Sequence, residues 1–433
     1  MSDESGDKFV TKRESFFLEF DSSFYRCYSL DKQPSGEKMP RSVPNVRLRI
    51  LLALFLVSIF VGAQKIETVN GVRVVHNEKG GKWGANPEVK LELVRTIGGL
   101  DAEVNLSFNN PNDIVQDSVG NLYILDTDNN RIQKLDSEGK FIKTIGRKGQ
   151  GPGEFQAAHS MDIDNEDNLF VFDMRSRRIE VLSSEGKPLR TTKFRAFSGG
   201  QIRLLKPGLI VRGGSLDYGI VMGRVKKLPK LLEVVDQNGK AKFAFGEATD
   251  YGDGNTSWHA NYFNLDTDSE KNICLNFQWQ NRIEKYAPDG RLLWRADRPL
   301  NYGTDVIEKG FVTRRGAQGP KMNVVSSGIA ADGKGRIWVI TLRRQLTKEE
   351  RGSGGSVVAT DAGVVSRTIP TQPKVVKGDA YKLEIFSPDG ILLGEISLTH
   401  HAHGIRIFGN NLFIREYYNT IFYQYKIIEN ESH

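Results

Sequence analysis

A tight turn ending in glycine recurs five times along this 433-residue chain, each time after a run of apolar residues. An acidic or amide residue precedes each glycine, and such a pair supplies the positive φ that a β-hairpin turn needs. The first four turns are 47, 53 and 51 residues apart. A period of about 40 to 50 residues with room for about four strands predicts the blades of a β-propeller. The five glycines are Gly139, Gly186, Gly239, Gly290 and Gly390.

The first repeat, residues 108–146, shows the predicted strand order most clearly. A run from 112 to 116 is followed by a turn at Gly120, and then by LYILD, the loop TDNN, RIQKLD, a turn at Gly139 and FIKTIG. The second repeat, which begins with FQAAHSMDI, has the same order. Short alternating runs separated by glycine turns predict four antiparallel strands per blade.

These residues resemble the NHL-repeat family. The family's blades end a strand in Asp, begin the next with Arg-Ile, and are joined by a glycine-rich segment that GQGPGEF at 149–155 matches. The resemblance is specific over residues 108–190 and weaker toward the C-terminus. It implies an all-β fold of four-stranded antiparallel blades.

Counting blades over residues 89–433 gives six, and the last one lacks a strand. Three strand-like runs follow Ile396, but no fourth remains before His433. The missing strand is available in VKLELVRTIGG, directly before the first blade. We therefore expect a six-bladed propeller whose ring an N-terminal strand closes, because closure removes a free sheet edge.

A second feature is the apolar run RILLALFLVSIFVGA, which follows three arginines and ends in small residues. This pattern predicts a secretory signal peptide over residues 39–63 and export to the periplasm or the outside of the cell. The run is shorter than the ~20 residues that a membrane-spanning helix needs. The alternative is a signal anchor, in which residues 48–63 hold the protein at the membrane. We hypothesise that the polar residues 1–38 come from a start codon assigned too early.

The net charge bears on which partners the protein can bind, and the cysteine count bears on whether it can form a disulfide. The net charge is +7, and removal of residues 1–63 leaves +6, with basic residues scattered along the chain. A scattered basic balance predicts a solvated surface, and we expect no nucleic-acid partner. Of the two cysteines, Cys27 would be lost with the leader, so Cys274 cannot form an internal disulfide.

The long connections predict which face of the ring binds a ligand. In an up-and-down blade, the D-to-A and B-to-C connections share one face, and the short glycine turns lie on the other. GRKGQGPGEF, residues 296–322 and an insertion at about 345–380 all belong to the first group. Long loops on a rigid scaffold carry binding and catalysis more often than short turns. We interpret 64–88 as a linker and 345–380 as a flexible insertion.

Three histidines form a candidate metal site. His159 and His403 are expected at the start of the innermost strands of blades two and six, and His259 lies two residues earlier in blade four. Three imidazoles from alternate blades could hold zinc and leave a position for water. This arrangement resembles that of peptidyl-α-hydroxyglycine α-amidating lyase, although the Pro-His pairs of that enzyme are absent. The alternative is polar histidines bonded to neighbours such as Asn112 and Ser327.

Calcium is the other metal considered, because gluconolactonase-like propellers hold it with channel carboxylates and amides. Here the strand starts offer Asn112, Asp113, Asn261 and Asn264, but no matching Glu. By contrast, Asp126 and Asp173 recur with Arg131, Arg178 and Arg282 in successive blades, which favours an architectural role.

The sequence therefore predicts a binding module whose ligand is a peptide, a glycan or a protein on the long-loop face. A metal-dependent lyase or hydrolase is the alternative. Aromatic residues are available for stacking on that face. The residues predicted for the channel rim and ligand contact are Asn112, Asn261, Ser327, Trp258 and Tyr262, with Tyr302, Tyr417 and Tyr418 nearby.

Overall fold

The computed structural model describes residues 64–194, 200–313, 316–351, 354–359, 365–370 and 378–430. Residues Gly62–His433 form one compact unit. The predicted leader and the extension before it lie outside the described residues. Among the residues that are described, no helix has the length and apolar character needed to cross a bilayer.

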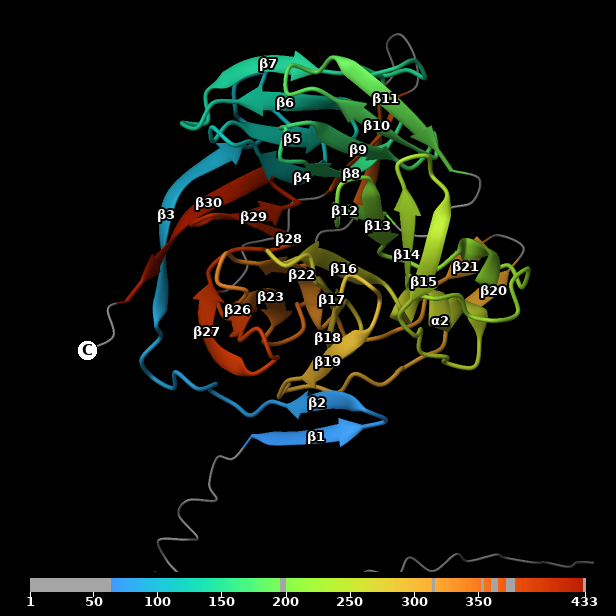
Figure 1. Ribbon diagram of the computed structural model, residues 1–433, viewed down its shortest axis with the longest axis vertical. Helices are drawn as coiled ribbons and strands as arrows, with labels where there is room; N and C mark the ends of the chain where they lie inside the picture. The colour runs from blue at the N-terminus through green and yellow to red at the C-terminus, as the bar shows by residue number, and fades with distance from the viewer. Residues whose placement is uncertain are drawn as a thin grey trace, which may run out of the picture. The chain divides into compact units, whose positions relative to one another are not determined.

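The compact unit is a six-bladed β-propeller (Figure 1), which confirms the predicted fold. Blade 1 contains β4 (Pro111–Gln116), β5 (Leu122–Asp126), β6 (Arg131–Leu135) and β7 (Phe141–Ile145). Blade 2 contains β8 (Ala158–Ile163), β9 (Leu169–Asp173), β10 (Arg178–Leu182) and β11 (Pro188–Lys193). Blade 3 contains β12 (Gln201–Leu204), β13 (Leu209–Gly213), β14 (Leu232–Asp236) and β15 (Ala241–Phe245).

The remaining blades follow the same antiparallel order. Blade 4 contains β16 (Phe263–Thr267), β17 (Ile273–Phe277), β18 (Ile283–Tyr286) and β19 (Leu292–Asp297). Blade 5 contains β22 (Ser326–Ala331), β23 (Ile337–Leu342), β26 (Tyr381–Phe386) and β27 (Leu392–Leu398). Blade 6 contains β28 (Gly404–Phe408), β29 (Asn411–Glu416), β30 (Ile421–Glu429) and β3 (Val89–Gly98).

The N-terminal strand closes the ring, as predicted. β3 pairs antiparallel with β30, from Val89 opposite Glu429 to Gly98 opposite Ile421. The innermost strands β4, β8, β12, β16, β22 and β28 contact one another in that order, and β28 contacts β4 again. Figure 1 shows these six strands nearest the centre.

Apolar side chains between neighbouring blades form the core. The buried residues fall into six hydrophobic clusters, and each cluster joins two adjacent blades. The cluster between blades 5 and 6 contains Trp338, which is fully buried. Since burial of apolar area stabilises by roughly 25 cal/mol per Å², and every interface needs both partners, the blades are expected to fold together. All the clusters lie within Gly62–His433, so this unit is expected to fold on its own.

The recurring glycine turns have the conformation that their sequence predicts. Gly139, Gly186, Gly239, Gly290 and Gly390 have φ between 77 and 88°, in the left-handed region that favours glycine. A register shift precedes each of these turns, for example between Lys134 and Leu135. This bulge lets one compact turn connect the third and fourth strands in five blades.

The region predicted as a linker, residues 64–88, instead contains a hairpin. β1 (Lys65–Val69) and β2 (Val72–His76) pair around Asn70 and Gly71, and β2 joins the outer strand β19 of blade 4 in parallel. Asn77 then donates to the carbonyls of Asp297 and Gly390 at 2.9 and 3.1 Å, and so links this segment to blades 4 and 5. The backbone N–H groups of Lys82 and Trp83 donate to the carbonyls of Leu392 and Leu393 in blade 5, at 3.1 and 2.7 Å. This segment is therefore held against two blades.

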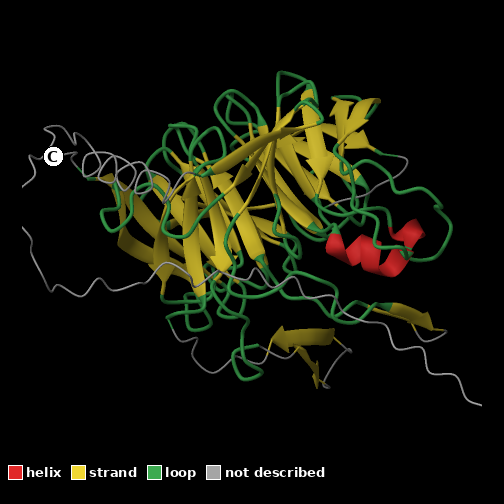
Figure 2. Ribbon diagram, turned by 90° about the horizontal axis from the view of Figure 1, so that it is seen from below, coloured by secondary structure: helices red, strands yellow, loops and turns green. Residues whose placement is uncertain are grey.

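The long connections lie on one face, as predicted. They carry η1 (Tyr218–Ile220), α2 (Gly254–Ala260), the hairpin of β20 (Phe311–Thr313) and β21 (Gly316–Gln318), and the hairpin of β24 (Gly354–Ala359) and β25 (Val365–Pro370). Figure 2 shows α2 outside the blades, next to the loops of this side. The rest of the predicted flexible insertion lies largely outside the described residues.

The repeated Asp and Arg residues hold these loops, which confirms their architectural role. The buried Asp126 carboxylate accepts the N–H of Asn109 at 2.7 Å and the Nε–H of Arg131 at 2.8 Å. In blade 2, Asp173 accepts the N–H of Gln156 at 2.8 Å, and Arg178 donates to loop carbonyls at Gln150, Gly151 and Glu154. The motif therefore ties each incoming loop to its blade.

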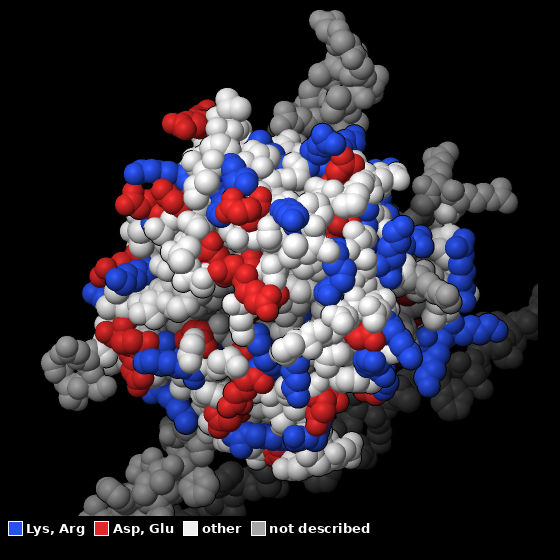
Figure 3. Space-filling model, turned by 45° about the horizontal axis from the view of Figure 1, so that its top comes forward, with Lys and Arg blue, Asp and Glu red and all other residues white. Residues whose placement is uncertain are grey.

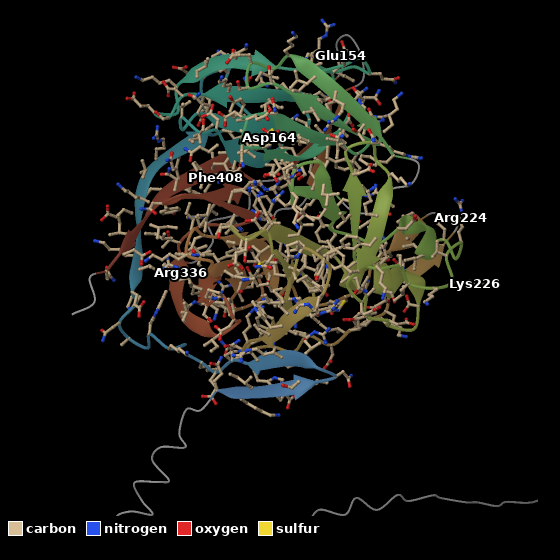
Figure 4. The ribbon with its side chains drawn as sticks, viewed as in Figure 1. Glu154, Asp164, Arg224, Lys226, Arg336 and Phe408 are labelled. Atoms are coloured by element: carbon tan, nitrogen blue, oxygen red, sulfur yellow. The ribbon has the colours of Figure 1, made fainter. Side chains whose placement is uncertain are left out.

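Surface charge of both signs is mixed over the face shown in Figure 3. The basic cluster in the loop of blade 3 is exposed, and Figure 4 places Arg224 and Lys226 away from the ring centre. This distribution agrees with a solvated surface.

Candidate functional site

A cavity lies at the ring centre, among the innermost strands, with about 630 Å³ of space, part of it open to solvent. At its outer end are side chains from the starts of these strands and from the second strand of blade 6. Farther along the same strands lie charged residues that form its floor. The outer residues used below are Asn112, His159, Tyr262, Asn264, His403 and Arg415.

Asn112 connects blades 6, 1 and 2 through hydrogen bonds. Arg415 donates Nη1–H to the side-chain oxygen of Asn112, so the amide nitrogen faces the other way. That nitrogen lies 2.7 Å from Nδ1 of His159. An amide nitrogen can only donate, so Nδ1 of His159 is the acceptor and the neutral ring carries its proton on Nε2.

Burial and the nearby charge of Arg415 keep the His159 ring neutral. Together they lower the pKa of His159 to about 4, because both penalise the imidazolium. Nε2 has no hydrogen-bond partner among the described residues. His159 therefore offers one N–H to the cavity at neutral pH.

His403 has the same tautomer for a different reason. The backbone N–H of Tyr417 donates to its Nδ1 at 3.2 Å. Burial, with the charge of Arg415, lowers the pKa of His403 well below its usual value. The ring is therefore neutral with its proton on Nε2. His403 lines both the central cavity and a second cavity at its mouth, so the two spaces meet at this residue.

Arg415 is a cation without a carboxylate partner among the described residues. Its Nη atoms donate to Asn112, to the carbonyl of Pro111 at 3.4 Å and to the carbonyl of His403 at 3.3 Å. Its Nε–H is buried and has no partner. Burial lowers the pKa of Arg415 from its usual value, because removing the charged guanidinium from water costs free energy.

The floor of the cavity is a network of opposite charges. Arg203 lies 2.9 Å from Asp266 and 3.7 Å from Asp113. Arg406 lies 3.3 to 3.7 Å from the same two carboxylates and from Asp162. These groups are buried and satisfy one another.

The floor carboxylates also join neighbouring blades. Asp113 accepts the N–H of Met161 at 3.0 Å, and Asp266 accepts the N–H of Ala331 at 3.1 Å. Their lone pairs are used by backbone and guanidinium donors. This part of the channel is therefore structural, and it closes the inner end of the cavity.

The mouth cavity lies on the long-loop face and has about 1430 Å³ of space, part of it open to solvent. Aromatic residues from four different segments line it: Trp279, Phe311, Tyr381 and Tyr418. Lys309, Lys321 and Arg351 add positive charge, and Glu308 adds negative charge. Flat aromatic faces beside polar groups are the usual lining of a site for an organic ligand.

His401 lies behind the aromatic wall of the mouth. It is 5% exposed, and neither of its ring nitrogens has a hydrogen-bond partner among the described residues. Its ring contacts Tyr418 at a centroid distance of 4.8 Å and stacks near His403 at 5.6 Å. Burial lowers the pKa of His401 to about 4. Buried polar atoms nearly always have a partner, so His401 is an exception within the wall of the mouth, although it lines neither cavity.

The structure places the predicted site residues in three groups. Asn112, His159, Tyr262 and His403 line the central cavity. Ser327 lines the mouth and donates to the carbonyl of Ala402 at 2.6 Å. His259, Asn261 and Trp258 line neither cavity; they belong to α2 or its C-terminus.

The expected strand position of His259 is wrong, because residues 254–260 form the helix α2. His259 donates from Nδ1 to the carbonyl of Asn255 at 2.9 Å. Asn261 caps the helix and bonds Thr249, and Trp258 donates to Leu216 at 2.7 Å. These three residues stabilise the loop.

The described residues do not fit a channel metal. They contain no group of three or more His, Cys, Asp or Glu side chains that could hold an ion. A histidine that binds zinc through Nε2 needs its proton on Nδ1, but N–H donors face Nδ1 in both His159 and His403. The channel carboxylates are occupied by arginines, so calcium fits no better.

Sequence reasoning did not identify Arg415, Trp279 or Tyr381. A comparison among repeats contains a signal for Arg415. On the second strand of each blade, Arg415 has the place of Leu125 in blade 1 and Phe172 in blade 2. The same place has Ile340 in blade 5 and Asn276 in blade 4. A charged residue there departs from the apolar pattern of blades 1, 2 and 5, and this favours a local function.

Three comparisons relate this chain to known proteins. Residues 108–205 match the family model DUF5128, described as a 6-bladed beta-propeller. The NHL repeat-containing protein 3 of Mus musculus is 33% identical over 78 residues, 17% of this chain. The match covers 22% of that protein, so the chain spans about a fifth of its length.

Two solved structures share the fold over most of the chain. One is a DUF4221 family member from Bacteroides vulgatus, with 13% identity, a TM-score of 0.50, and coverage of 79% of this chain and 99% of the other. The second, from Bacteroides fragilis, is named as a candidate exported protein, with 10% identity, a TM-score of 0.52, and coverage of 83% and 100%. The predicted resemblance to NHL-type six-bladed propellers is thereby confirmed, most specifically over the first two blades.

Proposed function

We propose that this propeller is exported and binds a peptide or glycan segment in the mouth cavity. The observation that carries the proposal is the aromatic lining of that cavity on the long-loop face. Trp279 and Tyr418 are half-buried and come from loops of blades 4 and 6. Aromatic faces of this kind stack on sugar rings and on apolar or aromatic side chains.

The shape of the mouth cavity favours a peptide or glycan segment as the ligand, rather than the flat surface of a folded protein. The cavity is concave, and it continues into the central channel at His403. A glycan and a peptide share this chemistry, and the experiment below separates them.

Glycan and peptide arrays with purified residues 62–433 test the proposal. The Trp279→Ala variant is expected to lose at least tenfold in affinity for any retained ligand. Phe243→Ala is a matched control, because Phe243 lies on the outer strand β15 and is 37% exposed. Equal loss in both variants, or no loss in Trp279→Ala, would contradict a site at the mouth.

Export rests on the leader-like residues 39–63. N-terminal sequencing of the native protein tests it. A mature start near Gln64 is expected, and retention of residues 48–63 would favour a signal anchor. The metal-dependent lyase or hydrolase alternative is tested separately by metal content, where zinc or calcium well below one equivalent is expected.

A further inference from the structure

We propose that the central cavity binds a carboxylate group at Arg415, with His159 and Tyr262 as additional hydrogen-bond donors. This inference rests on the proposed function and adds the chemical class of one part of the ligand. The groups come from blades 6, 2 and 4 and line the same cavity.

The first argument is that no carboxylate of the described residues contacts Arg415 directly. Arg203 and Arg406 in the same channel each lie within 4 Å of two or more carboxylates. Arg415 bonds an amide oxygen and two carbonyls instead. A buried cation with neutral partners is costly unless an anion completes its surroundings. Its unpartnered Nε–H gives that anion a donor.

The second argument is the orientation of the surrounding groups. The chain Arg415, Asn112, His159 fixes the proton of His159 on Nε2, so this ring is a donor. The hydroxyl of Tyr262 has no hydrogen-bond partner among the described residues and is close enough for Arg415 to act on its pKa. Donors without acceptors collect around Arg415, and a carboxylate supplies only acceptors.

The third argument is space. Gly404 pairs with Arg415 across β28 and β29. A Cβ at Gly404 would lie 3.4 Å from Nε of Arg415. Glycine at position 404 therefore keeps a side chain from filling the space beside Nε of Arg415.

Net charge favours a monoanion over a dianion. The floor holds Asp113, Asp162 and Asp266 against Arg203 and Arg406, an excess of one negative charge below Arg415. A monoanion in contact with Arg415 adds one negative charge near the floor carboxylates, whereas a phosphate dianion adds two, so electrostatic repulsion disfavours the dianion more strongly. A carboxylate is the common biological monoanion with this geometry. Peptide C-termini and acidic sugars both carry it.

Titration of residues 62–433 with acetate, acetamide and inorganic phosphate tests the inference, followed through the Arg Nε–H resonances by NMR. Acetate is expected to saturate one site, at least tenfold tighter than phosphate, with no saturation by acetamide. In Arg415→Met, acetate affinity is expected to fall at least tenfold. Arg224→Met is the matched control and should bind acetate unchanged, because Arg224 is exposed and lies away from the ring centre (Figure 4).

Thermal unfolding of Arg415→Met shows whether the variant is folded, and Arg415→Lys, which keeps the charge, should retain part of the binding. Absence of saturable acetate binding, equal binding in Arg415→Met, or equal affinity for phosphate would overturn the inference. If a ligand no longer binds to Trp279→Ala but binds normally to Arg415→Met, the carboxylate inference is wrong and the proposed function still holds. If acetate binds at Arg415 but no ligand is found whose binding depends on Trp279, the carboxylate site holds and the proposed function is wrong.

Discussion

The amide nitrogen of Asn112 lies 2.7 Å from Nδ1 of His159, and this contact fixes which ring nitrogen carries the proton. We expect two-bond ¹H–¹⁵N NMR spectra to show the Nε2–H tautomer. Since burial and Arg415 lower the pKa of His159 to about 4, the ring should stay neutral above pH 5. Observation of the Nδ1–H tautomer would contradict the assignment and reopen the metal alternative.

Replacement of Asn112 by Asp should reverse this behaviour. A carboxylate at this place would stabilise the imidazolium and give Arg415 a counterion, so the pKa of His159 should rise by more than one unit. Binding of acetate should weaken at the same time. Asn301→Asp is the control, because it makes the same chemical change at an exposed residue that lines neither cavity. An unchanged His159 titration in Asn112→Asp would show that the two side chains are not in contact.

The buried pair of Arg298 and Glu384 predicts a large effect on stability. The two side chains lie 2.9 Å apart with no exposed surface, and they join the connection after blade 4 to blade 5. Glu384→Gln leaves the arginine uncompensated and should cost about 3 to 5 kcal/mol in the free energy of unfolding. The double variant Arg298→Met, Glu384→Leu should recover most of this loss.

Urea unfolding measures the free energy of unfolding of both variants. Glu92→Gln, in the exposed pair with Lys90, should change stability by less than about 1 kcal/mol and is the control. If the double variant were as unstable as Glu384→Gln, packing and not charge would explain the loss.

Ring closure by β3 predicts a sharp limit to N-terminal truncation. A chain that begins at Pro87 keeps the pairing of Val89–Gly98 with β30, and it should unfold cooperatively. A chain that begins at Leu100 exposes the edge of β30 and should aggregate. Size-exclusion chromatography with circular dichroism compares the two. A monomeric, cooperatively folded chain without β3 would show that closure is not essential.

The contact of His76 with blade 4 predicts a pH dependence of the N-terminal hairpin. Hydrogen bonds to Glu67 and to Asp297, the latter at 2.6 Å, raise the pKa of His76. A raised pKa in the folded state means that the contribution is complete below the unfolded pKa of about 6.5 and is lost as pH rises through the folded value. Hydrogen exchange in β1 and β2, corrected for its intrinsic pH dependence, should therefore increase above neutral pH. His76→Gln should remove this dependence, and an equal dependence in the variant would assign it to another group.

The blades were predictable because their signals are local and repeated. Glycine with positive φ after an acidic or amide residue is required at the same place in five blades, and RTIG in the closing strand resembles KTIG at the end of blade 1. The hairpin of β1 and β2 has the favourable Asn70-Gly71 turn, yet its attachment to β19 depends on packing against residues more than 200 positions away. The pairing of β2 with β19 could not be predicted, because the two strands are far apart in the sequence and the pairing is not part of the repeat.

The site was only partly predictable for the same reason. Asn112, His159 and His403 follow from the repeat, because every innermost strand starts at the long-loop face. His259 does not, since Asp253 caps a helix with its side chain on the N–H of Thr256 and breaks the strand pattern. Arg415 lies on a second strand, and its approach to the channel depends on Gly404 beside it and Asn112 in the next blade.

The central claim is that the ligand binds on the long-loop face. Hydrogen exchange of residues 62–433, with and without a ligand retained on the glycan or peptide arrays, tests this claim most directly. We predict protection in the connections that line the mouth, at 278–282, 303–325 and 417–420, and at the start of β28. The glycine turns at 139, 186, 239, 290 and 390 should not change. Protection confined to those turns, on the opposite face, would contradict the account.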